Sequence, residues 1–344
     1  MFDILHPVVN NYLPLFMIFY NYICLIIAKL LLISFIIYIT IKFIQCFRRN
    51  QTITSKGKAV LITGCDTGFG HLLALSLNGL GFRVYATVYD TNTSGAQMLS
   101  KKCQFIDKMV VIKMDVTNDQ EVRHVYQQVS EDLTKNDVVL WSVVNNAGLM
   151  LYSRLDWGSL ESIQNVFEVN VFGVLRVTRI FLPLIKQSKG RVINYSSIVA
   201  YCSLQNLGIY CMSKAAVLRF SETLRKEMNE FGVTVSTICP GYYAHTELTN
   251  IALKGLEKAW NETDESVKSG YGDNYCDKIK KLYVKLQGMS FAQGNPNVVV
   301  NDIIDAIMNT SPKSHYFPID GIVGKLAFYC NKYLCDTPDI LNKM

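Results

Sequence analysis

The stretch "KAVLITGCDTGFG", Lys58 to Gly70, decides the fold. Its first half is a short apolar run, which is typical of a buried parallel strand. Three glycines follow, and then an apolar pattern with helical spacing from Leu72 to Leu80. Strand, glycine turn and helix in this order form the arrangement that binds a dinucleotide. Gly64 permits the tight turn, Gly68 lets the backbone approach the diphosphate, and Gly70 allows close packing of the helix, whose N-terminal N–H groups bind phosphate.

Two carboxylates near this turn are candidates for the adenosine ribose. The next apolar run, Phe82 to Val88, should end beside that ribose. Asp90 follows Gly70 by 20 positions, the spacing at which NAD sites carry an acidic residue, and Asp66 lies within the turn itself. The alternative for either aspartate is a solvated loop residue. No Lys or Arg stands in the turn or directly after the strand to receive a 2′-phosphate, so the sequence favours NAD over NADP.

The rest of the chain continues the same architecture. Further apolar runs occur at 109–116, 140–148, 190–197, 233–241 and 314–319. Helical patterns of 12 or more residues separate most of them, as parallel crossovers require. The sequence therefore predicts a single α/β domain with a doubly wound parallel sheet, over residues 56–320. Active residues of such sheets gather at the C-terminal ends of the strands, where the sequence places Asp115, Asn146, Ser197, Pro240 and Gly241.

The first fifty residues differ from the rest of the chain. They are hydrophobic from Tyr12 to Phe47 with few interruptions, and Tyr22 to Ile41 is long enough to span a membrane if Lys29 reaches the nearer interface. We therefore expect an N-terminal transmembrane anchor within residues 1–50. The alternatives are a buried core helix and a shorter, re-entrant or doubled segment.

The charges that flank this run predict its orientation. No Lys or Arg precedes Lys29, which disfavours a cleaved signal peptide and a mitochondrial presequence. Basic residues crowd the other flank between Lys42 and Lys58. By the positive-inside rule the following domain is cytosolic, so we expect a single-pass protein of the endoplasmic reticulum membrane.

Composition excludes several other functions. The 344 residues carry a net charge of +6, with no basic stripe interleaved with aromatics, so nucleic acid is not an expected partner. Ten cysteines occur without a CxxC pair or a Cys/His ligand spacing. This pattern argues against structural zinc and against a disulfide framework, and we expect no metal.

The stretch "YCMSK" places a phenol and an ammonium group one helical turn apart. Tyr210 and Lys214 are i and i+4 neighbours and share one face of a helix. A free tyrosine has a pKa of about 10, and a nearby cation lowers that value because it favours the phenolate. A tyrosine tuned in this way can exchange a proton with an alcohol.

The motifs together resemble those of the short-chain dehydrogenase/reductase family. They run in family order: TGxxxGxG at 63–70, NNAG at 145–148, Asn170, Ser197, YxxxK at 210–214 and the turn at Pro240 and Gly241. The stretches "ITGCDTGFG", "PGYY" and "SGYGDNY" are similar to the branch that holds retinol, 17β-hydroxysteroid and 3-hydroxybutyrate dehydrogenases.

The resemblance implies a role for each matching position. Tyr210 would be the catalytic acid/base, and Lys214 would lower its pKa and hold the nicotinamide ribose. Ser197 would bind the substrate oxygen, and Asn170 would hold a water that extends the proton relay. Asp115 would contact adenine. The implied cofactor contacts are Thr63, Gly64, Asp66, Gly68, Phe69, Gly70, Asp90, Asp115, Val116, Asn146, Ala147, Gly148, Tyr210, Lys214, Pro240 and Gly241.

The resemblance also implies where substrate is chosen. The family builds a substrate lid after the sixth strand, here about residues 242–295, and Ser197, Tyr242 and Tyr243 are expected substrate contacts. The membrane anchor and "PGYY" favour a lipophilic alcohol, a steroid or a retinoid, oxidised with NAD. His245 is not needed for this chemistry.

Two alternatives remain open. One is a 3-hydroxybutyrate dehydrogenase-like enzyme, and the other is a membrane-anchored binding protein of the same fold that has lost turnover. A homodimer is compatible with either reading. The apolar C-terminal segment, 321–344, either lies against the membrane or packs on the domain.

Overall fold

The computed structural model describes residues 2–48, 51–243, 248–272, 274–288, 294–321, 324–326 and 328–329. The chain divides into two units, Met1–Thr52 and Ile53–Met344. The first is one long helix, α1 (Phe2–Arg48). Its stretch Met17–Ile41 is apolar enough and long enough to cross a membrane, and no part of that stretch is buried. The candidate span therefore begins five residues before the expected Tyr22 and ends at the same residue.

The second unit is built on a seven-stranded sheet with the order β3-β2-β1-β4-β5-β6-β7. Every neighbouring pair is parallel. The strands are β1 (Lys58–Ile62), β2 (Arg83–Val88), β3 (Met109–Lys113), β4 (Val139–Asn145), β5 (Arg191–Tyr195), β6 (Thr234–Ile238) and β7 (His315–Tyr316). Each lies within an apolar run of the sequence, and the predicted doubly wound α/β fold is confirmed. The order reverses at β1, with β2 and β4 on either side, which is where such sheets bind ligands.

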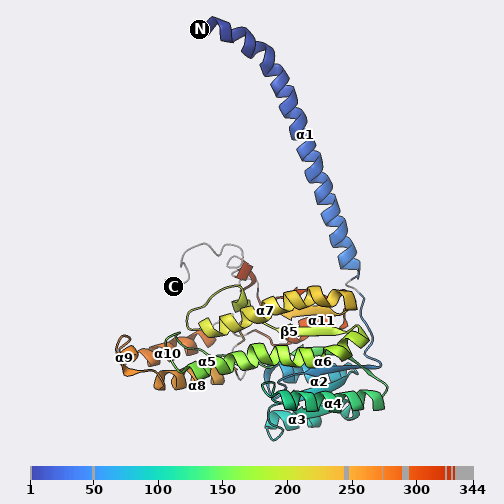
Figure 1. Ribbon diagram of the computed structural model, residues 1–344, viewed down its shortest axis with the longest axis vertical. Coiled ribbons are helices and arrows are strands. Elements are labelled where there is room, and N and C mark those ends of the chain that lie inside the picture. Colours follow the sequence, from blue (N-terminus) through green and yellow to red (C-terminus); the bar gives the residue numbers. More distant parts are fainter. Residues whose placement is uncertain are drawn as a thin grey trace. The chain divides into compact units, whose positions relative to one another are not determined.

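Helices cover both faces of the sheet (Figure 1). One face carries α2 (Gly68–Gly79), α3 (Ser94–Lys102) and α11 (Asn297–Met308). The other carries α4 (Asp119–Lys135), α6 (Val174–Ser188) and α7 (Gly208–Met228). A short helix, α5 (Leu160–Phe167), runs into a π-helical turn, Glu168–Gly173, and then into α6.

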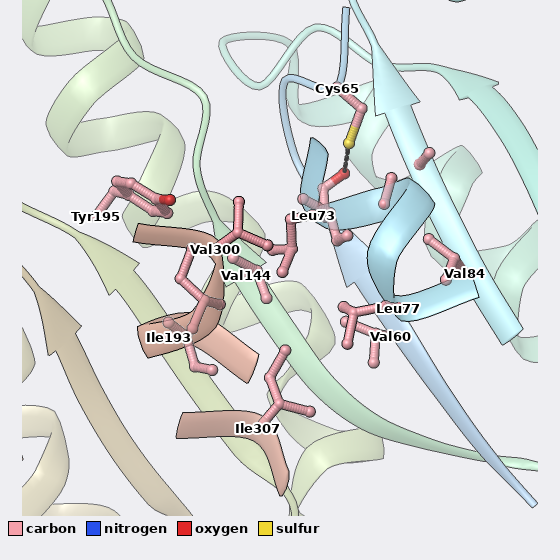
Figure 2. Packing of buried hydrophobic residues seen from close by; sticks show 14 of the residues in the cluster. Val60, Cys65, Leu73, Leu77, Val84, Val144, Ile193, Tyr195, Val300 and Ile307 are labelled. Carbon is pink, nitrogen blue, oxygen red and sulfur yellow. Dashed lines mark hydrogen bonds between the residues drawn. The ribbon is translucent and has the colours of Figure 1, made fainter. Parts of the chain in front are cut away.

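The core on the α2 face is aliphatic and closely packed. Figure 2 shows Val60, Val144 and Ile193 of three adjacent strands facing Leu73 and Leu77 of α2, with Val300 and Ile307 of α11 alongside. Burying one such side chain stabilises a fold by about 1.5–3 kcal/mol. Because both faces are covered, the strands consist mainly of apolar residues rather than alternating with polar ones.

A second, smaller core lies under three helices that follow β6. These helices are α8 (Leu248–Asn261), α9 (Glu265–Lys268) and α10 (Tyr275–Gln287). They gather at one end of the domain (Figure 1) around the buried Trp157, whose ring contacts those of Trp260, Tyr271 and Tyr275 at 4.6–6.0 Å. This is the segment expected as a lid. His245, residues 289–293 and most of residues 321–344 lie outside the described residues.

Candidate active site

The glycine turn is held against the loop after β4. Asn146 donates from Nδ2 to the carbonyl oxygens of Thr63 and Gly64, both at 2.8 Å. In return, the Thr63 hydroxyl accepts from the N–H groups of Asn146 and Ala147 at 3.0 and 2.9 Å. A Cβ on Gly70 would lie 2.4 Å from Asn146 Nδ2, so no larger residue fits there without displacement. The close approach of Asn146 to the start of α2 therefore requires glycine at position 70.

A cavity of about 830 Å³ opens along the C-terminal ends of the strands, within the roughly 300–1,000 Å³ typical of small-molecule sites. It runs past the N-terminus of α2, where Gly68 has φ of +63° and a Cβ built on it would meet nothing within 4 Å. That end offers an open cradle and helix N–H groups for a diphosphate. The site therefore fits a dinucleotide.

The expected ribose carboxylates line this cavity but already bind backbone. Asp66 accepts from Tyr89 N at 3.1 and 3.2 Å through its two oxygens, and Asp90 N lies 3.5 Å from one of them. Asp90 in turn accepts from Asn92 N at 2.9 Å. Both aspartates thus fix the turn after β2, and they keep two negative charges at this end of the cavity.

The adenine candidate lies at the end of β3. Asp115 lines the cavity, and its Oδ1 accepts from Thr117 N and Thr117 Oγ1, both at 2.8 Å. Val116 also lines the cavity and is 7% exposed. The contact of these residues with adenine remains a prediction.

The structure brings Tyr210, Ser197 and Lys214 together at the other end. Ser197 lies in extended backbone just after β5, and its hydroxyl accepts from Val199 N at 3.3 Å. The same hydroxyl interacts with the Tyr210 phenol and lowers its pKa. Lys214 is 4% exposed and lies one turn below on α7, with Nζ 5.6 Å from the centre of the Tyr210 ring. Its Nζ donates to the carbonyl oxygen of Tyr195 at 3.2 Å. All three side chains line the cavity.

Asn170 lies behind this group and is fully buried. Its amide accepts from Leu149 N at 2.7 Å and donates to Leu149 O at 2.8 Å and to Ser213 Oγ at 3.0 Å. These bonds place it between the loop after β4 and α7. It lies in the π-helical turn, a distortion frequent at functional sites. The expected water contact of Asn170 remains a prediction.

Burial governs the pKa values of Tyr210 and Lys214. Burial raises the pKa of Tyr210, and the hydrogen bond with Ser197 is what lowers it in part. Burial also lowers the pKa of Lys214 from 10.5 to about 8. The Lys214 ammonium group is directed to the Tyr195 carbonyl, and its expected lowering of the Tyr210 pKa remains a prediction.

The end of the cavity beyond Tyr210 is apolar. Its walls include Leu149, Met150, Val199, Leu204, Leu207 and Ile251. None of them was singled out by the sequence, because an apolar loop residue carries no motif. Tyr242 and Tyr243 also line the cavity. Tyr243 donates to Pro318 O at 3.0 Å and packs edge-on against Phe69 at 5.4 Å. Tyr243 thus borders the cofactor end rather than the apolar end.

Charge is unevenly distributed along the cavity. Among the described residues that line it, Lys214 is the one Lys or Arg, and Asp66, Asp90 and Asp115 are the acidic ones. Neither a 2′-phosphate at the ribose end nor a carboxylate at the apolar end would therefore meet a dedicated cation from the described walls.

Arg154, in the loop after β4, contacts the smaller core under α8, α9 and α10. Its guanidinium group is hydrogen-bonded to the Tyr275 hydroxyl and lies over the rings of Tyr271 and Tyr275, 5.8 and 5.5 Å from their centres. Tyr152, in the same loop, packs on Tyr283 of α10 at 4.5 Å. The helices after β6 are thus anchored beside the apolar end of the cavity.

Comparison with known proteins agrees with this geometry. The short chain dehydrogenase family profile matches residues 58–255. Estradiol 17-beta-dehydrogenase 2 of Rattus norvegicus is 37% identical over 268 residues, 75% of this chain and 67% of that protein. The mitochondrial D-beta-hydroxybutyrate dehydrogenase of Rattus norvegicus is 35% identical over 277 residues, 79% of each chain.

A similar fold occurs in a crystal structure of a short-chain dehydrogenase/reductase from Burkholderia phymatum in complex with NAD. Its TM-score is 0.65 at 20% identity, covering 83% of this chain and 98% of that one. The family and branch expected from the sequence motifs are confirmed. The chain belongs to the short-chain dehydrogenase family, and it is an oxidoreductase related to steroid and hydroxybutyrate dehydrogenases.

Proposed function

We propose that this protein is an NAD-dependent dehydrogenase that interconverts a lipophilic secondary or allylic alcohol, a steroid or a retinoid, and its carbonyl compound. One observation carries the proposal: Ser197, Tyr210 and Lys214 line one cavity that extends from the glycine turn to an apolar wall. Proton-transfer groups and an apolar binding wall are both needed for such a substrate.

The bound nicotinamide would supply the hydride acceptor. Ser197 would hold the substrate oxygen, and the Tyr210 hydroxyl, bonded to Ser197, would exchange the proton with that oxygen. Lys214 has a pKa of about 8 and is mostly protonated at neutral pH, so it can donate to ribose hydroxyls. In alcohol oxidation the phenol must lose its proton, so its pKa has to fall when cofactor and substrate fill the site.

The apolar wall of the cavity favours a lipophilic alcohol over 3-hydroxybutyrate as the substrate. A 3-hydroxybutyrate anion carries a carboxylate that must be paired once it leaves water. The described walls beyond Tyr210 are aliphatic and offer no Lys or Arg for it. Burying the carbon skeleton of a steroid or retinoid there gains about 25 cal/mol per Å² of apolar surface. A non-catalytic role is disfavoured because Ser197, Tyr210 and Lys214 are all present.

The membrane helix fits a substrate dissolved in lipid. We propose that Met17–Ile41 anchors the enzyme in the endoplasmic reticulum membrane as a single span. The basic residues between Lys42 and Lys58 would keep the catalytic domain on the cytosolic side, where added NAD can reach it.

We expect intact microsomes that carry the protein to form NADH from all-trans-retinol, estradiol or androstanediol without detergent. The kcat/KM for one of these should exceed that for 3-hydroxybutyrate at least tenfold, about 1.4 kcal/mol. External protease should abolish the activity. Microsomes carrying Tyr210→Phe give the background rate.

Two results would contradict this account. Preference for 3-hydroxybutyrate would overturn the substrate class. Activity that appears only after detergent is added, together with glycans on the sequons at Asn92 or Asn261, would place the catalytic domain in the lumen. These two asparagines are exposed and report on topology, whereas Asn194 and Asn309 are 0% and 2% exposed.

Asp66→Asn should increase the use of NADP. The asparagine oxygen can still accept from Tyr89 N, so the turn is kept while one negative charge beside the 2′-phosphate is removed. We expect kcat/KM with NADP to rise about tenfold, about 1.4 kcal/mol, and kcat/KM with NAD to change far less. Steady-state kinetics with both cofactors measures this change.

The matched control is Glu131→Gln, which removes one negative charge from the exposed surface of α4. It should not alter the ratio of NAD to NADP use. An unchanged ratio in Asp66→Asn would show that this carboxylate does not govern the choice. A wild-type preference for NADP above tenfold would overturn the proposal of NAD.

A further inference from the structure

Tyr195 is a buried tyrosine in the wall of the cofactor cavity. It is the last residue of β5, it is 6% exposed and it lines the cavity. Its side chain lies on the same side of the sheet as Val300 and Leu73 (Figure 2). Its backbone carbonyl receives the Lys214 ammonium group at 3.2 Å. The backbone of Tyr195 thus already binds a proposed catalytic residue, Lys214.

The ring of Tyr195 is fixed between the two ends of the cavity. It stacks on Phe69 with ring centres 6.1 Å apart and planes inclined by 21°. Phe69 lies in the first turn of α2, at the diphosphate end, and it also packs edge-on against Tyr243. Lys214 lies on the other side, at the catalytic end. Tyr195 therefore links the two ends, with its ring packed on Phe69 and its backbone carbonyl bonded to Lys214.

The hydroxyl of Tyr195 is buried and has no hydrogen-bond partner among the described residues. Two other buried tyrosines of the domain do have a partner: Tyr85 bonds to Asp132 and Tyr316 to Asp305, each at 2.6 Å. A buried hydroxyl without a partner is unfavourable, and such groups are rare. Burial raises the pKa of Tyr195, so the phenol stays protonated and is a hydrogen-bond donor.

We propose that Tyr195 is a cofactor-binding residue whose hydroxyl donates a hydrogen bond to an oxygen of the bound nicotinamide dinucleotide. The position between Phe69 and Lys214 leaves two acceptors of the same chemistry, a diphosphate oxygen and the carboxamide oxygen of the nicotinamide. The inference rests on the dinucleotide binding proposed above. It adds a contact that the family motifs do not include, from a residue outside the glycine turn and the Tyr210–Lys214 pair.

Tyr195→Phe tests this contact by calorimetric titration of the full-length protein in detergent. We expect the affinity for NADH to fall about tenfold, about 1.4 kcal/mol. ADP-ribose and ADP separate the two acceptors. If the acceptor is a diphosphate oxygen, the affinities for ADP-ribose and ADP fall as well. If it is the carboxamide, they do not change and only NADH binds more weakly.

Thermal unfolding gives a second readout that a purely structural role would not reproduce. Without cofactor, Tyr195→Phe should unfold at the same temperature as wild type or higher, because an unsatisfied buried hydroxyl is removed. With saturating NADH its temperature rise should be smaller than that of wild type. The control Tyr316→Phe breaks a satisfied bond, so it should lower the unfolding temperature without changing NADH affinity.

Equal NADH affinity in Tyr195→Phe and wild type would overturn the inference and leave Tyr195 a core residue. A wild-type protein that binds none of the three nucleotides would instead contradict the proposed dinucleotide binding itself. The two failures are therefore distinguishable.

Discussion

Tyr210→Phe is expected to lower kcat about 10³-fold, within the roughly 10²–10⁴ that a positioned acid/base contributes. The phenylalanine ring can still pack in the first turns of α7, but the group that exchanges a proton with the substrate oxygen is lost. Affinity for NADH should change less than threefold, about 0.7 kcal/mol. Stopped-flow hydride transfer and NADH titration measure the two quantities separately.

Tyr201→Phe is the matched control for that variant. Tyr201 lies four residues after Ser197, but it does not line the cavity, and its hydroxyl faces His315 Nδ1 at 3.4 Å. It should keep kcat within about twofold of wild type. Tyr210→Phe with more than a few per cent of the wild-type kcat would remove Tyr210 from the proton transfer.

Lys214→Met is expected to reduce kcat/KM at least about 10²-fold and, at the same time, to stabilise the fold. Folding lowers the pKa of Lys214 from 10.5 to about 8 through burial. At about 1.4 kcal/mol per pKa unit, keeping this charge buried costs of order 3 kcal/mol. Losing the bond to Tyr195 O offsets about 1 kcal/mol of the gain, so urea unfolding at pH 7 should show a net increase of about 2 kcal/mol.

The pH dependence of this stability gain follows from the same shift. Between pH 8 and 10.5 the unfolded chain holds a proton that the folded chain has lost, so wild-type stability rises with pH in this window. The penalty is fully present below pH 8 and absent above 10.5. The advantage of Lys214→Met should therefore be largest at pH 7 and shrink toward pH 10.

Two further variants test the burial cost of the Lys214 charge and the role of Lys214 in activity. Lys226→Met, on the exposed side of the same helix, should change the free energy of unfolding by less than about 0.5 kcal/mol. Lys214→Arg keeps the charge but should also be severely impaired, because a planar guanidinium group does not replace a compact ammonium group. A destabilised Lys214→Met, or near-normal activity of Lys214→Arg, would contradict the account.

The sheet and the glycine turn could be predicted from the sequence because each rests on a local requirement. Covering both faces of a parallel sheet makes its strands continuous apolar runs, which the printed sequence displays. Gly70 must be glycine because a Cβ would collide with Asn146. Tyr210 and Lys214 share a helix face through their spacing, and α7 begins two residues before Tyr210.

The finer features of the site depend on which partner a side chain reaches, and spacing does not reveal that. Asp66 and Asp90 stand where ribose carboxylates are expected, yet both bind backbone N–H groups. Lys214 donates to the Tyr195 carbonyl of another element, and burial raises the pKa of Tyr210.

The unsatisfied hydroxyl of Tyr195 could not be read from the sequence either. It becomes visible only when the packing around the end of β5 is known, because Phe69 and Tyr243 come from segments distant in the chain. The same holds for the apolar wall beyond Tyr210, which is built by the segments after β4 and β5 and by α8.

The central claim is that hydride passes between the carbinol carbon of a lipophilic alcohol and a nicotinamide while Tyr210 exchanges the proton. The most direct measurement uses a steroid or retinoid alcohol labelled with deuterium at that carbon, with wild-type and Tyr210→Phe membranes and mass analysis of the reduced cofactor. The account predicts that wild type forms NADH carrying one deuterium and that Tyr210→Phe forms almost none. Reduced cofactor without deuterium, or equal labelling by both proteins, would contradict it.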